Sequence, residues 1–185
     1  MYSYLKGIIK EIEPTKITLE IHDIGYHLIT PNPYDFTIDD VVKVYVFQYV
    51  REDEISLYGF KTLEAKELFM QLLSVKGIGP KSALAVLASA EVSEIIRAIE
   101  ASDTKYLNRF PGIGPKASQQ IVLDLKGKIT HSPMTIKQSN KLSDVEDALR
   151  ALGYKTKEIN RVVKELDRTK ETALLIKDAL KLISN

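Results

Sequence analysis

The chain has 185 residues, of which 26 are Lys or Arg and 25 are Asp or Glu, so its formal charge is only +1. This near balance argues against a uniformly basic surface that coats nucleic acid. The apolar fraction of 44% fits a globular protein of one or two domains, and the absence of Cys excludes disulfides and Cys-ligated metal sites. No segment resembles a signal peptide or a membrane span, so we expect a cytoplasmic protein.

Residues 1–62 are predicted to form five short strands. Apolar residues recur at every second position around Ile17 and Val44, which is the pattern of half-buried strands. Five short strands with one long connection suit a small barrel, of which the OB-fold is the commonest example. The predicted strands cover roughly residues 3–10, 15–21, 24–30, 41–49 and 55–60.

From residue 63 to residue 128 the apolar period becomes that of helices. The pentapeptide GIGPK occurs twice, at 77–81 and 112–116, each time between helical segments, which indicates a repeated helix, glycine-rich turn and helix. Apolar residues at helical spacing predict the buried helix faces, which comprise Ala65, Leu68, Phe69, Leu72, Leu73, Leu84, Leu87, Ala88, Ile95, Ile96, Ile99, Ile121, Val122 and Leu125.

The repeated turn predicts a phosphate site. N–H groups of a glycine-rich turn and of the following helix's first turn point together into solvent, where the helix dipole favours an anion. Helix packing explains the glycines, but it does not explain a lysine after the same proline in both copies. Backbone contacts carry no sequence information, so we expect nucleic acid selected by shape. The candidate DNA-binding residues are Lys76, Gly77, Ile78, Gly79, Lys81 and Ser82 in the first hairpin, and Gly112, Ile113, Gly114 and Lys116 in the second.

A short charged run, Arg51 to Glu54, lies between two predicted strands. Its simplest interpretation is a solvated hairpin turn. Three adjacent carboxylates in a β-turn rarely all face one metal ion, whereas in a DNA-binding protein they can exclude phosphates and so guide the strands. No catalytic residue, metal ligand or cofactor is predicted, because the histidines are scattered and Pro80 occupies a position where a Walker A loop requires Gly.

Residues 129–142 and 143–185 are predicted to be a flexible linker and a three-helix unit. The linker contains no acidic residue, and Ser143 with Glu146 predicts a capping box at the start of the first helix. Such a small core suits a docking module. The apolar positions at helical spacing are Val145, Ala148, Leu149, Leu152, Ile159, Val162, Val163, Leu166, Leu175, Ile176, Ala179 and Leu180.

Three signatures, in this order, carry a resemblance to a known family. The barrel ends in REDEISLYGF, the second hairpin reads FPGIGPKASQQIVLDLKGK, and the last unit contains ALRALGYKTKEINRVVKEL. Over nearly its whole length the chain resembles the RuvA family, the Holliday junction branch-migration subunits of bacteria. The resemblance implies an α+β multidomain protein with an OB-fold barrel at 1–62, a tandem helix-hairpin-helix domain at 63–128, and a UBA-like three-helix domain at 143–185.

The resemblance further implies a non-catalytic, cytoplasmic subunit that acts in homologous recombination and DNA repair. Family members assemble as a homotetramer, or as an octamer of two tetramers, that holds four-way junction DNA open for the hexameric ATPase RuvB. The implied acidic pin at the junction crossover is Glu52 and Asp53, and whether the resolvase RuvC also docks stays open. The implied RuvB-binding residues are Leu149, Leu152, Tyr154 and Leu180, of which at least two are expected to belong partly to the core.

Two departures from the family pattern matter. Members often carry two consecutive lysines after the second hairpin and an arginine in the next helix, whereas this chain has Pro115 before Lys116, and Gln119 and Gln120 in that helix. Fewer cations predict a shallower salt dependence for the second hairpin. The linker is also short, and a flexible chain of about 14 residues spans roughly 20 Å.

Two other functions stay open on the residues alone. One is a structure-selective nuclease that uses the acidic turn with a divalent ion, and the other is a protein-interaction scaffold whose glycines only pack helices. The charge distribution favours a DNA binder that discriminates by geometry. Residues 1–62 hold 6 basic and 10 acidic side chains, net −4, residues 63–130 hold 9 and 7, net +2, and residues 131–185 hold 11 and 8, net +3.

Overall fold

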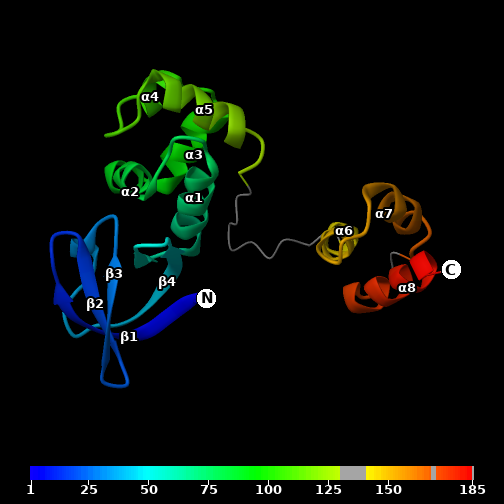
Figure 1. Ribbon diagram of the computed structural model, residues 1–185, viewed down its shortest axis with the longest axis horizontal. Coiled ribbons are helices and arrows are strands. Elements are labelled where there is room, and N and C mark those ends of the chain that lie inside the picture. Colours follow the sequence, from blue (N-terminus) through cyan, green and yellow to red (C-terminus); the bar gives the residue numbers. More distant parts are fainter. Residues whose placement is uncertain (130–140, 168–169, 185) are drawn as a thin grey trace. The chain divides into compact units, whose positions relative to one another are not determined.

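The computed structural model describes residues 1–129, 141–167 and 170–184. The chain divides into two compact units, Met1–His131 and Ser132–Asn185. Strands and helices both contribute to the first unit, whereas the described residues of the second are helical (Figure 1). The predicted α+β class is confirmed. None of the helices in the described ranges has the length and apolarity that a membrane crossing requires.

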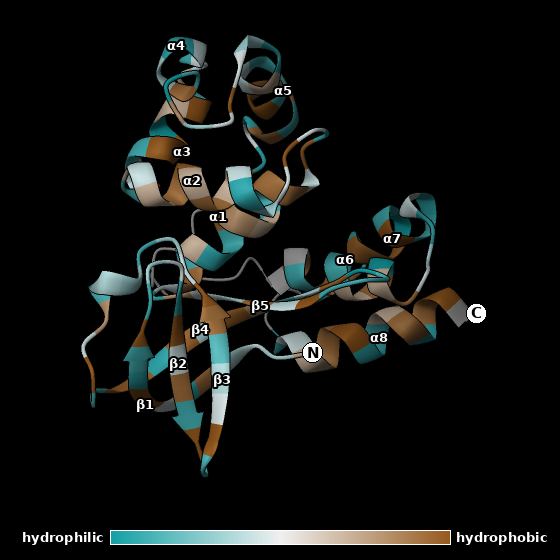
Figure 2. Ribbon diagram, turned by 60° about the vertical axis from the view of Figure 1, so that its left-hand side comes forward, coloured by the Kyte–Doolittle hydropathy of each residue, from teal (hydrophilic) through white to brown (hydrophobic). Residues whose placement is uncertain are grey.

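Five strands close into a barrel with the neighbour order β1-β2-β3-β5-β4. All pairs are antiparallel except β3 and β5, and each predicted strand is present to within two residues. Hydrophilic and hydrophobic residues alternate along the strands (Figure 2), and the barrel interior is filled by every second side chain around Ile17 and Val44. The strands are β1 (Tyr4–Ile12), β2 (Lys16–Ile21), β3 (Ile24–Ile29), β4 (Val41–Val50) and β5 (Ile55–Phe60), with a short 3₁₀ helix, η1 (Pro33–Asp35), before β4.

Five helices follow the barrel in the same unit. Thr62 caps the first of them, because its hydroxyl accepts a hydrogen bond of 3.2 Å from the Ala65 N–H. Prolines occupy the first position of the second and fifth helices, where a missing N–H costs no helical hydrogen bond. The helices are α1 (Leu63–Ser74), α2 (Pro80–Ser89), α3 (Val92–Glu100), α4 (Thr104–Leu107) and α5 (Pro115–Leu125).

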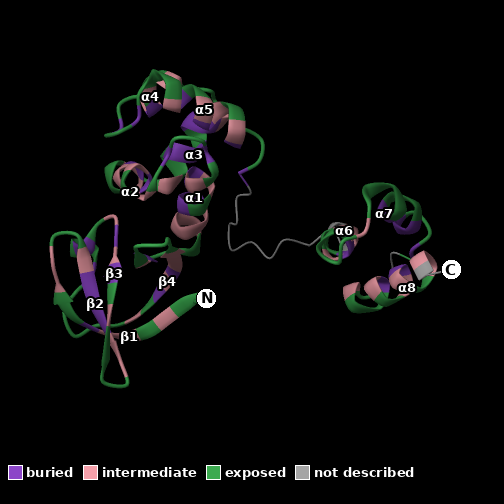
Figure 3. Cartoon of the chain, in the orientation of Figure 1, coloured by how far each residue is buried: buried purple, intermediate pink, exposed green. Residues whose placement is uncertain are grey.

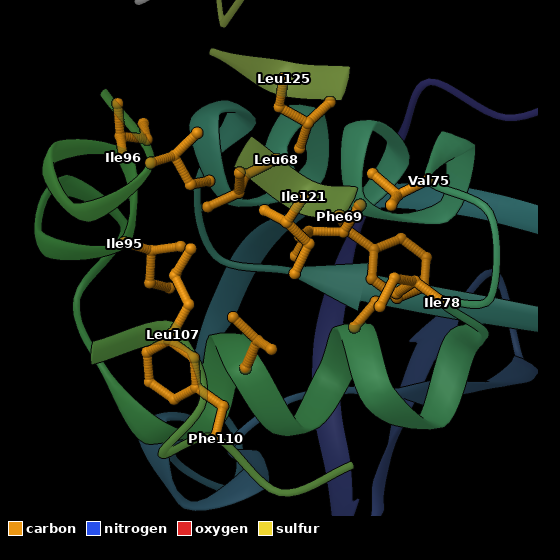
Figure 4. Close-up of a cluster of buried hydrophobic side chains, with 14 of the residues drawn as sticks. Leu68, Phe69, Val75, Ile78, Ile95, Ile96, Leu107, Phe110, Ile121 and Leu125 are labelled. Carbon is orange, nitrogen blue, oxygen red and sulfur yellow. The ribbon is translucent and has the colours of Figure 1, made fainter. Parts of the chain in front are cut away.

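Besides the core inside the barrel, a second hydrophobic core joins the barrel to the hairpins. Phe69 of α1 lies between two aromatic residues of β5, with its ring centroid 5.1 Å from that of Tyr58 and 4.9 Å from that of Phe60. The cluster continues to Ile121 and Leu125 of α5 (Figure 4). Because these contacts bridge β5, α1 and α5, the barrel and the helix-hairpin-helix repeat form a single packed body.

The predicted buried face of α2 needs correction. Ala83 and Val86 are buried, whereas Leu84 and Leu87 are only half-buried and Ala88 is exposed. The apolar stripe of this alanine-rich helix is broad, so spacing alone did not select the face that meets the core. For α3 the prediction is confirmed, since Ile95, Ile96 and Ile99 are all buried. Figure 3 shows buried segments along this helix.

The described residues of the second unit form three helices around a small core. The first begins at Lys141, so Ser143 lies inside it and the predicted capping box is wrong; the remainder of the predicted linker, 130–140, lies outside the described residues. The Lys155 N–H instead donates to Glu158 Oε2 at 2.8 Å, at the start of the next helix. The helices are α6 (Lys141–Ala151), α7 (Thr156–Val163) and α8 (Thr172–Ser184), and the core is Val145, Leu149, Ile159, Val162, Val163, Leu166, Leu175 and Ala179.

Candidate nucleic-acid interface

The first GIGPK turn joins α1 to α2. Gly77 has a φ of +90°, which an L-residue adopts only with strain, and Gly79 is the extended N-cap of α2. The Ile78 N–H donates to the Val75 carbonyl at 3.1 Å, and its side chain, only 6% exposed, packs into the core (Figure 4). The isoleucine between the glycines therefore anchors the turn from beneath.

The second GIGPK turn, between α4 and α5, repeats this geometry. Gly112 has a φ of +77°, and Gly114 is the extended N-cap of α5. The Ile113 N–H donates to the Phe110 carbonyl at 3.0 Å, and its side chain is 4% exposed. Ile78 and Ile113, which were predicted among the DNA-binding residues, thus have both their side chains and their N–H groups committed inside the protein.

Each turn still presents a set of free backbone donors. Around the first turn, four N–H groups have no hydrogen-bond partner within the described ranges, namely those of Gly77, Gly79, Lys81 and Ser82. The same holds at the second turn for Gly112, Gly114, Lys116 and Ala117. Orphan donors at a helix N-terminus, together with the helix dipole, form a site suited to a phosphate oxygen.

The two turns lie next to each other. A Cβ built on Gly112 would stand 2.9 Å from Ser82 Oγ and 3.6 Å from Ser82 Cβ, so the second turn rests on the first turn of α2. Gly77, by contrast, faces open space. Ser82, predicted as a DNA contact, therefore also lies at the packing contact between the hairpins, where the second turn meets the start of α2.

Exposed cationic residues lie in or near both turns in the sequence. Lys76, Lys81 and Lys116 are all exposed and have no ion-pair partner in the described part of the chain. Arg109, which is not among the predicted contacts, is also exposed, and its guanidinium carbon lies 5.8 Å from the centroid of the Tyr106 ring. Its place three residues before Gly112 makes it a further candidate cation at the second turn.

The acidic turn is a four-residue connection between β4 and β5. The Arg51 N–H donates to the Glu54 carbonyl at 2.8 Å and closes the turn. Glu52 and Asp53 are exposed, and neither forms an ion pair with any residue that the structure describes. Burial, with smaller contributions from Glu54 and Tyr49, raises the pKa of the Tyr58 hydroxyl at the base of this hairpin.

Across residues 1–129, 141–167 and 170–184, no three His, Cys, Asp or Glu side chains converge to form a metal-binding group. The acidic turn therefore stands as a group of adjacent carboxylates on one hairpin. Adjacent carboxylates with no opposing cation create a local negative potential at the surface.

The four residues predicted to bind RuvB differ in how far they are exposed. Leu149 is 0% exposed and belongs to the core of the second unit, so its side chain supports the surface from beneath. Tyr154 and Leu180 are half-buried against the same core, which confirms that at least two of the four belong partly to it. Leu152 is 60% exposed and provides the most accessible apolar contact of the set.

Three family models match successive parts of the chain. They are the RuvA N terminal domain at residues 1–59, a SAM-like helix-hairpin-helix tandem at 69–127 and the RuvA C-terminal domain at 140–184. A protein from Acholeplasma laidlawii named Holliday junction branch migration complex subunit RuvA is 44% identical over 184 residues, which is 99% of each chain. The chain belongs to the RuvA family.

Other relatives with the same name extend the RuvA match over whole chains. The protein from Halalkalibacterium halodurans is 43% identical over 202 aligned positions that include all of both chains. The protein from Lactobacillus gasseri is 44% identical over 189 positions, which is 99% of this chain and 98% of the relative. The tandem match includes both GIGPK turns, so the RuvA architecture of OB-fold, paired hairpins and C-terminal domain is present in full.

Proposed function

We propose that this RuvA-family chain is a non-catalytic DNA-binding subunit that recognises four-way junctions by shape. The observation that carries the proposal is the contact of Gly112 with Ser82, which sets two groups of free N–H donors side by side. All of these donors bind phosphate oxygens, so they recognise the position of the DNA backbone and make no contact with its bases. The names of the relatives, which describe subunits of a Holliday junction branch migration complex, support this function.

Four copies in a homotetramer match the four near-equivalent arms of a junction through closed cyclic contacts, and two tetramers can enclose one junction as an octamer. In this assembly the hairpins of each copy hold one duplex arm. The acidic turns meet at the crossover, where Glu52 and Asp53 repel phosphates and part the strands. The partner that moves the DNA is the hexameric ATPase RuvB, and the surface that engages it comprises Leu152, Tyr154 and Leu180, supported by Leu149.

A binding titration tests the central claim. A labelled four-way junction and a linear duplex of the same sequence are titrated with the full chain, and the mass of the free protein is measured in solution. We expect a tetramer that binds the junction at least tenfold more tightly than the duplex. Equal affinities contradict shape recognition, the absence of binding supports a scaffold, and cleavage of the junction with magnesium supports a nuclease.

Neutralising the acidic turn tests its role at the crossover. The double variant Glu52→Gln/Asp53→Asn is expected to bind duplex more tightly and so to lose much of its preference for the junction. The matched control is Asp23→Asn/Asp39→Asn, which removes two carboxylates from other turns of the barrel, where asparagine tolerates the positive φ. If both double variants keep the full preference, the acidic turn does not act at the crossover.

The motor-binding surface has a separate test. Leu152→Asp places a charge at an exposed position, so the helices should stay folded by circular dichroism. We expect the variant to bind the junction normally but to lose co-purification with RuvB and stimulation of branch migration. Normal stimulation by this variant would remove Leu152 from the interface.

A further inference from the structure

We infer that Tyr49 and Ser56 fold the two flanking charges of the acidic turn back onto the strands, so that Glu52 and Asp53 are the only charges at its tip. The turn holds Arg51, Glu52, Asp53 and Glu54, and a freely moving Arg51 could neutralise an adjacent carboxylate. Tyr49 is thus a positioning residue that acts through Arg51. The consequence for DNA rests on the proposed function, whereas the side-chain arrangement does not.

The arginine is held by two contacts with one tyrosine. Arg51 Nε donates to the Tyr49 hydroxyl at 2.6 Å, and the guanidinium carbon lies 5.1 Å from the centroid of the Tyr49 ring. The first contact is a short hydrogen bond with a charged donor, and the second is a cation–π interaction. Residues 49 and 51 are two positions apart, so their side chains lie on the same face of β4 and of its extension into the turn. This brings the two side chains together.

The carboxylate at the other end of the turn is held in a corresponding way. The Ser56 hydroxyl donates to Glu54 Oε1, again between residues two positions apart. Tyr49 and Ser56 are themselves cross-strand partners in the β4–β5 register. The cross-strand pair of Tyr49 and Ser56, one rung of the hairpin, therefore holds the side chains of both flanking residues. The two residues at the tip of the turn then carry two negative charges.

The tyrosine in this rung has a rigid support. Its ring packs edge-on against Tyr58, with centroids 6.1 Å apart, and Tyr58 packs against Phe69 of α1 at 5.1 Å. Phe69 is fully buried in the core that the barrel shares with the hairpins. The Tyr49 ring that holds Arg51 is thus supported by the same body that carries the proposed DNA-binding turns.

The experiment combines two readouts on the full chain. The first is the ratio of duplex to junction dissociation constants for wild type, Tyr49→Leu and Tyr49→Leu/Arg51→Gln. We expect Tyr49→Leu to lower this ratio by about fivefold. Loss of the hydrogen bond and of the ring contact frees Arg51 to neutralise the negative charge at the tip of the turn. The double variant should return to within about twofold of wild type, since it has no arginine to release.

A purely structural role for Tyr49 predicts a different result. If the ring mattered only for packing, removing Arg51 would not restore the ratio, so a double variant no better than Tyr49→Leu overturns the inference. An unchanged ratio in Tyr49→Leu overturns it as well. Ser56→Ala provides the matched change on the other side of the rung, where release of Glu54 adds negative charge and should not lower the ratio.

The second readout needs no DNA. In ¹H–¹⁵N spectra of the free protein, the Arg51 Nε–H should exchange with solvent at least tenfold more slowly than that of exposed Arg97, and Tyr49→Phe should remove this protection. Fast exchange of Arg51 in wild type overturns the arrangement itself. Slow exchange in a wild-type protein that does not prefer junctions would instead support the arrangement and contradict the proposed function.

Discussion

The two GIGPK hairpins have the same five residues and nearly the same backbone, yet their surroundings differ. Both turns pair a positive-φ glycine with an extended glycine N-cap, and both bury the isoleucine between them. The first turn follows a helix of 12 residues, whereas the second follows a helix of only 4. Gly77 faces open space, while Gly112 rests on Ser82.

This difference separates what a glycine does for its own turn from what it does for the fold. At Gly77 a side chain would meet no neighbouring atom, so glycine is required only because the backbone φ is positive. At Gly112 the close approach of a second segment adds to that requirement. The repeated sequence therefore encodes the shape of each turn, and the contact at Gly112 arranges the two turns as a pair.

The largest expected effect comes from reversing the charge of both hairpins. Lys81→Glu/Lys116→Glu should abolish junction binding at about 100 mM salt, because it replaces attraction by repulsion at both phosphate sites. Each single charge reversal should leave measurable binding. Titrations of the double variant and of the two single variants therefore compare the two hairpins directly. The control Lys164→Glu/Lys177→Glu makes the same change of charge in the second unit, and unchanged binding by the hairpin double variant would rule out the phosphate contacts.

The next effect concerns stability and separates the two glycines. Gly77→Ala should destabilise the fold by about 1 kcal/mol, the cost of a left-handed alanine, and Gly112→Ala by about 2 kcal/mol, because Ser82 must also change rotamer. Urea unfolding measures both. Adding Ser82→Ala to Gly112→Ala should recover part of the difference, and equal costs at the two glycines would contradict the close contact.

A smaller effect should appear when a cation is added to the second hairpin. Gln119 is exposed on α5, whereas Gln120 is hydrogen-bonded to Asp124, so Gln119→Lys is the milder change. It should tighten junction binding and steepen the log–log salt dependence by about one. Thr37→Lys, on the connection before β4, is the control with the same charge. A slope unchanged by Gln119→Lys would place this side of α5 away from the DNA.

The smallest effect is expected at the prolines. Pro80→Ala and Pro115→Ala each replace the first residue of a helix, where proline removes no helical hydrogen bond. Each variant should change stability by less than about 1 kcal/mol, and the two values should agree within the error of urea unfolding. A large difference would show that the two helix starts are not equivalent.

Much of the architecture was predictable from local pattern. All five predicted strands are present, two of them marked by alternation around Ile17 and Val44, and the GIGPK repeat located the helix starts at Pro80 and Pro115. The start of α6 was missed because Ser143 offered a good cap, yet the helix extends back to Lys141, and Leu142 packs against the core of the second unit. Tertiary packing overrode the local signal there, as it did for the buried face of α2.

The sequence by itself determined the order of the units, the shape of each hairpin turn and the residues that carry its charge, because these depend on neighbours a few positions apart. Only the tertiary structure decided that Gly112 meets Ser82, that Ile78 and Ile113 point inward, and that Arg51 donates a hydrogen bond to Tyr49. Those contacts join segments through packing, and packing depends on shape in three dimensions, which periodicity does not encode.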